Sequence, residues 1–376
     1  MVLDYNLDGF RLPCIIQTDA EYYECLKIEF AKYLGKIKEL YEEKIYEETK
    51  NNVDFILKAL ENYYNANMTG AEECITSILR ENMDSPYIVS ELKKSYAFKA
   101  SAAKEIRSKI YKESDYICDN ILKKEVILFR ARVNSQRLEE EQMLHIPFNM
   151  RGKISTQRFS MYGVPSFYFA TTSFGAWMEL GMPDLKKFQV SGFFLPENLK
   201  ILNLCIYQDF INGFSNIEEE KEILNCFVKF FPLVIASSYR VLEEERKFKS
   251  EYIISQLIMQ ASIKLGIDGI AYLSKKMEDN YSFPQSVNLA ILIPQNKNLS
   301  SMYWSRMSDV IYTSPFFMED IPKDFNSKNE TLINEFFQQI DYDEVKVAEQ
   351  IICYSKMKFS KFDSFIYDKL CELREK

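Results

Sequence analysis

The spacing of apolar residues changes at Val126, and this change constrains the fold more than any other feature of the sequence. In the first third of the chain, apolar residues recur three or four positions apart, which is the spacing of an amphipathic helix. From Val126 to Val133 they alternate, as they do in a β-strand. One face of this expected strand is apolar, and the other carries Leu128, Arg130 and Arg132. The pattern therefore predicts helices followed by a sheet.

Apolar stripes and capping signals predict helices before Val126. The expected helices are one that follows the capping-box pattern Thr18-x-x-Glu21 and runs towards Thr49, one over Asn52–Tyr64, one that follows Thr69-x-x-Glu72 and ends near Asn82, and one over residues 100–122.

Strands and helices are expected in mixed order after Val126. The expected strands are Val126–Val133, Ser166–Ala170, Phe188–Leu195, Lys200–Leu204, Gly269–Leu273 and Val287–Ile293, with the third and fourth forming a hairpin or lying side by side. The expected helices are Thr172–Leu180, Ile217–Phe231, Glu251–Leu265, Glu330–Ile340, Glu344–Tyr354 and Phe362–Arg374. The predicted fold class is α+β, with a helical N-terminal domain over residues 1–122, a mixed β core domain over 123–315 and a helical C-terminal extension over 316–376.

Composition narrows the classes of function. The net charge of −8 argues against a protein whose main task is to hold a nucleic-acid backbone. No N-terminal run combines positive charge with a long apolar stretch, and no apolar window reaches the roughly 20 residues that cross a bilayer. We therefore expect a cytoplasmic protein that binds neither membranes nor nucleic acids.

The chain is poor in the residues that most metal and phosphate sites use. Its single histidine, His145, excludes a His-based zinc site elsewhere, and the eight cysteines never occur as C-x-x-C. Only 11 glycines are present, and neither G-x-G-x-x-G nor G-x-x-x-x-G-K-[ST] occurs. We therefore expect no metal, and any nucleotide site would use side chains instead of a glycine-rich loop.

Five polar residues of the β-rich part are candidates for a site. Arg130 and Arg132 leave the same face of one strand, where they would either hold phosphates by bidentate hydrogen bonds or face solvent. Tyr168 is explained equally by core packing, and Ser274 by a turn at the end of a strand. Glu179 stands in an apolar stretch, so it must be paired, exposed or functional, because burying a lone carboxylate is costly.

These residues together resemble the RES domain, a family named for its arginine, glutamate and serine. Glu179 follows Tyr168 at the family's spacing of eleven residues. The matching segments are Leu128-Phe129-Arg130-Ala131-Arg132, Gln157-Arg158-Phe159-Ser160, Phe167-Tyr168-Phe169-Ala170, Glu251-Tyr252-x-x-Ser255-Gln256, Asp268 to Ser274, and Asn288. Together they cover about Val126 to Ile293.

The chain departs from the family pattern in two places. Gln157 stands where a glycine usually precedes the arginine, and the family's serine matches either Ser274 or another nearby serine such as Ser282. The helical segments at both ends have no counterpart in the smallest members, although larger members carry helical N-terminal extensions.

The resemblance implies a fold related to ADP-ribosyltransferases and a toxin that destroys NAD⁺. Members cleave the nicotinamide–ribose bond by hydrolysis or phosphorolysis, so NAD⁺ is a substrate, inorganic phosphate a candidate co-substrate, and no cofactor is needed. The implied partners are an antitoxin or regulatory protein and further copies of the chain. The implied roles are electrostatic stabilisation by Glu179, pyrophosphate binding by Arg130 with Arg158 or Arg132, ring stacking by Tyr168, and hydrogen bonding to substrate or phosphate by Ser274.

Two other functions stay open at this stage. The same residues would also serve an ADP-ribosyltransferase that modifies a macromolecule, which labelled NAD⁺ would reveal as label on the acceptor. The other alternative is an inactive middle domain, with the helices acting as a protein-interaction module.

Overall fold

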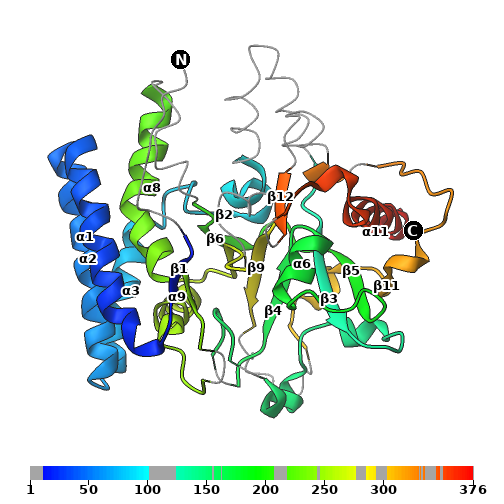
Figure 1. Cartoon of the computed structure of the whole chain (residues 1–376), viewed down its shortest axis with the longest axis horizontal. Coiled ribbons are helices and arrows are strands. Elements are labelled where there is room, and N and C mark those ends of the chain that lie inside the picture. Colours follow the sequence, from blue (N-terminus) through cyan, green and yellow to red (C-terminus); the bar gives the residue numbers. More distant parts are fainter. Residues whose placement is uncertain are drawn as a thin grey trace.

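The computed structural model describes most of the chain. The described residues are 12–100, 124–154, 156–161, 163–206, 218–243, 246–276, 285–293, 303–329, 331, 333–334, 344–347 and 350–375. The helix expected over residues 100–122 lies, apart from Ala100, outside them, and so does most of the one expected over Glu330–Ile340. The described part is an α+β fold, as expected (Figure 1).

A mixed sheet forms the centre of the molecule, with nine strands in the described part of the chain. Its strands, in spatial order, are β10 (Ile311–Tyr312), β5 (Phe188–Phe194), β3 (Leu128–Val133), β4 (Ser166–Ala170), β9 (Val287–Leu292), β8 (Gly269–Leu273), β6 (Lys200–Leu204) and β2 (Val89–Glu91), and β11 (Phe316–Phe317) also pairs with β5. Neighbours are antiparallel except β6 and β8, which are parallel. A separate parallel pair joins β1 (Cys14–Ile16) to β7 (Tyr239–Val241).

Two expectations were wrong, one about strand pairing and one about a helix. The strands β5 and β6 do not pair, because β3, β4, β9 and β8 lie between them in the sheet. The expected helix over Glu344–Tyr354 is instead an antiparallel pair, β12 (Glu344–Val347) and β13 (Gln350–Cys353). This segment alternates β-branched residues, with Val345 opposite Ile352, and such side chains fit a pleated strand better than a helix.

The helices agree better with the sequence patterns. They are α1 (Tyr22–Leu40), α2 (Glu43–Tyr64), α3 (Met68–Glu81), α6 (Ser173–Glu179), α8 (Glu218–Ala236), α9 (Ile253–Lys264) and α11 (Lys358–Arg374). The first expected helix was too long, because the backbone is extended at Tyr41 and Glu42 and the chain turns back there. Neither expected threonine caps a helix: Thr18 donates to Glu21, and α3 is capped by Asn67, whose side chain accepts from Gly70 N.

Two hydrophobic cores lie on the two faces of the sheet. The residues of β3 alternate between them, since Leu128 belongs to the first core and Phe129 to the second. The first core joins one face of the sheet to α1, α2, α3, α8 and α9, and the second joins the other face to α6 and α11 (Figure 1). Among the described residues, no helix is both long and apolar enough to span a membrane.

The N-terminal helices share the first core with the middle of the chain. The hydroxyl of Tyr22 donates to Ala236 O at 2.8 Å, and that of Tyr33 donates to Val228 O at 2.7 Å, so α1 is bonded directly to α8. The edge strand β2 also comes from the first 122 residues. The domain boundaries at 122 and 315 stay predictions. Because the core is shared, removing the N-terminal helices would expose apolar residues of the remaining chain.

Candidate functional site

Arg130 and Arg132 leave β3 on the face that carries the first core. Both side chains are half-buried, and they are held by neutral carbonyl groups. Arg130 donates to Tyr168 O at 3.0 Å, and Arg132 donates to Leu144 O at 2.9 Å. Neither makes an ion pair with any described residue, and the Nε of each has no hydrogen-bond partner in the described part of the chain. Two positive charges therefore lie together, and no carboxylate of a described residue forms an ion pair with either.

Burial makes these two charges costly. Burial, together with the neighbouring charge of Arg132, lowers the pKa of Arg130 to about 9. Burial also lowers the pKa of Arg132. Both guanidinium groups remain charged at neutral pH, but the charged form is destabilised. An anion that reached them would remove part of this cost, because a buried charge is stabilised by a partner with hydrogen bonds.

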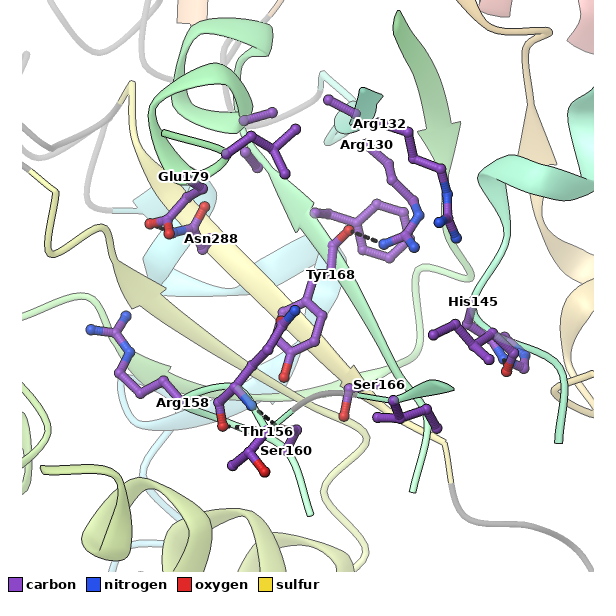
Figure 2. A pocket seen from close by; sticks show the side chains of 18 of the residues that line it. Arg130, Arg132, His145, Thr156, Arg158, Ser160, Ser166, Tyr168, Glu179 and Asn288 are labelled. Atoms are coloured by element: carbon purple, nitrogen blue, oxygen red, sulfur yellow. Dashed lines mark hydrogen bonds between the residues drawn. The ribbon is translucent and has the colours of Figure 1, made fainter. Parts of the chain in front are cut away.

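Tyr168 lies next to this pair, and Arg158 lies on the other side of Tyr168 (Figure 2). The phenol of Tyr168 donates to Phe159 O at 2.6 Å, and burial raises its pKa, so it stays protonated. The guanidinium carbon of Arg158 lies 4.3 Å from the centre of the Tyr272 ring, and its Nη2 donates to Leu273 O at 3.0 Å. The ring of Tyr168, whose hydroxyl is already bonded, is the part of this residue that is left to contact a ligand.

Glu179 is the last residue of the short helix α6. The helix begins at Ser173 and is capped by Thr172, whose hydroxyl accepts from Gly175 N at 2.9 Å. The carboxylate is exposed, and its Oε1 accepts from Asn288 Nδ2 at 2.7 Å. Asn288 is buried on β9, opposite Ala170 in the register of the sheet. A rigid strand therefore holds the carboxylate from one side and leaves the rest of it accessible.

These residues line one cavity of about 1280 Å³. Figure 2 shows Glu179 and Asn288 on one side of Tyr168, with Arg130 and Arg132 on the other. The basic lining residues are Arg130, Arg132, Lys153, Arg158, Arg240, Arg246, Lys249, Lys275 and Lys276, and the acidic ones are Glu141, Glu179, Glu243 and Glu251. Although the chain is acidic overall, this lining is basic and favours a ligand with negative charge.

Ser274 is placed differently from the other sequence candidates. It is buried just after β8 and is not among the lining residues. Its N–H donates to Ser286 O, and its hydroxyl accepts from Lys276 N at 3.3 Å. Ser282, the alternative, lies outside the described residues. Gln157, which replaces the family's glycine, keeps a negative φ, and its N–H donates to Ser160 Oγ at 2.7 Å.

The lone histidine lies in the wall of the cavity with both ring nitrogens bonded. His145 Nε2 accepts from Trp304 N at 2.9 Å, so Nδ1 carries the hydrogen and donates to Ile146 O at 2.9 Å. Burial, together with the charge of Arg130, lowers the pKa of His145 to about 4. The ring is therefore neutral at physiological pH and supports the wall.

Sequence reasoning missed a second wall, which the N-terminal segment helps to build. Arg246 and Glu251 line the cavity and form a buried ion pair, with Nη2 and Oε1 2.7 Å apart. Asp19 bonds Arg246 Nη1 at 2.6 Å and accepts from Ser250 N at 2.9 Å. No local pattern predicts this network, because more than 200 residues separate Asp19 from its partners. The family resemblance was the only feature of the sequence that pointed to Asn288 as a residue of the site.

Comparison with known proteins gives one informative match. An alignment over 185 residues, which covers 45% of this chain, is 35% identical to a protein of Bacillus subtilis (strain 168) named "Putative toxin YopC". The match covers 41% of that protein, so the chain spans about two-fifths of its relative's length. No family model matches the chain, and no solved structure matches it.

Proposed function

We propose that this chain is an NAD⁺-degrading enzyme of the toxin type, which cleaves the nicotinamide–ribose bond by hydrolysis or phosphorolysis. One observation carries the proposal: uncompensated arginines and an accessible carboxylate lie in the same basic cavity. The resemblance to the RES domain and the name of the B. subtilis relative agree with it. A relation of the sheet to the ADP-ribosyltransferase fold is part of the same proposal.

The arginine pair would bind the pyrophosphate of NAD⁺. Both half-buried guanidinium groups line the cavity, and their Nη groups would donate to the phosphate oxygens. Arginine suits this task because its planar fork binds two oxygens at once. The Tyr168 ring would stack on a ring of the dinucleotide. For Ser274, which is buried behind the wall, contact with substrate or phosphate stays a prediction.

The bond to nicotinamide would break without a general acid. The pyridinium ring takes the electron pair of the C–N bond and leaves as neutral nicotinamide. The ribose carbon then resembles an oxocarbenium ion, which a nearby carboxylate stabilises electrostatically. Glu179 supplies that carboxylate, with Asn288 holding it in place. Oxygen of water or phosphate forms the new bond to the ribose carbon, and any proton lost goes to solvent.

Nicotinamide release by the purified chain tests the proposal directly. Glu179→Gln should lower kcat by about 10²-fold or more, because the amide carries no charge for the transition state. Glu197→Gln is the control, since Glu197 is exposed and does not line the cavity. Near wild-type turnover in Glu179→Gln would rule out its assignment.

The products identify the acceptor. ADP-ribose indicates water, and phosphorylated ADP-ribose indicates phosphate. Label transferred from NAD⁺ to a macromolecule would replace this proposal with an ADP-ribosyltransferase. Growth arrest and NAD⁺ loss on expression, both abolished in Glu179→Gln, would support the toxin role, and co-purification from the native host would identify an antitoxin.

A further inference from the structure

The helix that carries Glu179 is too short to hold its own position. α6 has seven residues, and isolated helices of this length are not stable in water. Its place beside the cavity must therefore come from tertiary contacts. Asn288 fixes the C-terminal end through Glu179, and the contacts at the other end decide the direction in which the helix points.

A buried carboxylate of the C-terminal region holds the start of α6. Oδ1 of Asp363, on α11, accepts from the backbone N–H of Ser173 at 3.0 Å. Its Oδ2 accepts from the hydroxyl of Tyr354. Asp363 and Tyr354 are 1% and 0% exposed, so water cannot replace either bond. These partners lie 190 and 181 residues after Ser173 in the chain, outside the segment that resembles the RES domain.

Aromatic packing and a tight backbone contact complete this attachment. The ring of Phe359 on α11 lies 5.6 Å from that of Phe174 and 5.3 Å from that of Trp177, measured between centroids. On the opposite side, Gly175 has no room for a side chain, because an added Cβ would lie 2.9 Å from Gln285 O. The helix therefore packs against both α11 and the segment that leads into β9.

We propose that Asp363 and Tyr354 are positioning residues, which orient α6 and thereby place Glu179 at the cavity. The inference rests on the proposed role of Glu179. Removing the Asp363 carboxylate leaves the buried Ser173 N–H without its acceptor and removes the bond from the Tyr354 hydroxyl, which favours local opening of α6. Substrate would still meet the arginines of β3, so the loss should appear in kcat more than in KM.

Asp363→Ala, Asp363→Asn and Tyr354→Phe in the full chain test the inference, with Asp368→Ala as matched control. Asp368 is also a buried carboxylate of α11, but it accepts from Lys328 N and Asn329 N instead of from α6. Hydrogen exchange of the α6 amides reports its attachment, and steady-state kinetics reports the placement of Glu179.

In Asp363→Ala, we expect α6 exchange at least about ten-fold faster and kcat at least about ten-fold lower, with KM changed less than three-fold. Asp363→Asn keeps an acceptor for Ser173 N and should restore both values. Asp368→Ala should leave α6 exchange and kcat unchanged. If Asp363→Ala does not fold, Tyr354→Phe removes the bond to Asp363 Oδ2 but keeps the bond between Asp363 and Ser173 N, and should show the same changes to a smaller degree.

An unchanged rate of hydrogen exchange in α6 of Asp363→Ala would overturn the inference. If Asp363→Ala does not fold, an unchanged rate in Tyr354→Phe would overturn it. Equal losses of kcat in the Asp363 and Asp368 variants would also overturn it. The exchange measurement needs no substrate. If the wild-type chain released no nicotinamide, the proposed function would fail, while the attachment of α6 by Asp363 would still be decided.

Discussion

Arg130 and Arg132 illustrate how a residue's chemistry depends on what surrounds it. The strand pattern alone favours the interpretation that they are the solvent-facing side of a strand. In the structure they are half-buried, bonded only to carbonyl groups among the described residues, and placed in one cavity with Glu179. A guanidinium in such a place costs free energy that a bound phosphate would offset.

Arg130→Lys should lower kcat/KM for NAD⁺ by on the order of ten-fold to a hundred-fold, because an ammonium keeps the charge but loses the planar fork. Steady-state kinetics and calorimetric binding of NAD⁺ measure the loss. Arg137→Lys is the control, since Arg137 is paired with Asp320 outside the cavity lining. Equal kinetics in the two variants would remove Arg130 from the binding site.

At the scale of elements, the position of α6 depends on its close contact with the backbone of Gln285 and Ser286 as much as on its own sequence. Thr172 caps it locally, but Gly175 is needed where the helix meets the backbone of Gln285 and Ser286. An added Cβ would lie 2.9 Å from Gln285 O and 3.2 Å from Ser286 Cα, and backbone atoms cannot move aside as a flexible side chain can.

Gly175→Ala should therefore destabilise the protein by about 1–3 kcal/mol and reduce turnover by displacing α6. Gly35→Ala is the matched control, because Gly35 lies within α1 with open space around it. There alanine should raise the free energy of unfolding by about 0.5–1 kcal/mol, since glycine is a poor helix former. Chemical denaturation measures both, and a neutral Gly175→Ala would contradict the close approach.

At the scale of the whole molecule, two buried groups link stability to pH in opposite directions. Burial raises the pKa of Asp363 from 3.8 to about 7. Its stabilising contribution is therefore complete below about pH 3.8 and is lost as pH rises through 7. The pKa of His145 is lowered from 6.5 to about 4, so its contribution is present above pH 6.5 and is lost as pH falls through 4.

Asp363→Asn removes the pH-dependent contribution of Asp363 to stability and keeps that of His145. Between pH 4 and pH 7, the stability of the wild type should fall relative to the variant by on the order of a few kcal/mol. Denaturant unfolding at several pH values measures the difference, in which the His145 term cancels. A constant difference over this range would mean that Asp363 does not change its protonation there.

Removing the N-terminal helices should disrupt the fold of the remainder. Residues 123–376 alone would expose the face of α8 that carries Phe231, which packs against Tyr33. Without β2, β6 would also become an edge strand of the sheet. We expect an insoluble fragment when it is expressed beside the full chain. A soluble fragment that cleaves NAD⁺ without regulation would instead indicate a separate regulatory domain.

The sequence by itself determined the elements whose signals are local. The strands β4 and β8 have the predicted bounds, and α6 was predicted within one residue at each end, because alternation, helical spacing and caps act over a few residues. The grouping of Arg130, Tyr168 and Glu179 was available only through the family resemblance, since spacing alone does not bring them together. Their shared cavity comes from the sheet, which places β3 beside β4.

Only the tertiary structure decided the contacts between residues far apart in the chain. It separated β5 from β6 by four strands, joined Asp19 to Arg246, and brought Asp363 to Ser173. Such contacts depend on which buried faces and buried donors find partners when the whole chain packs, and no short segment contains that information. Local chemistry therefore determined which residues are available for the site, and long-range packing determined how Glu179 and the arginines are held there.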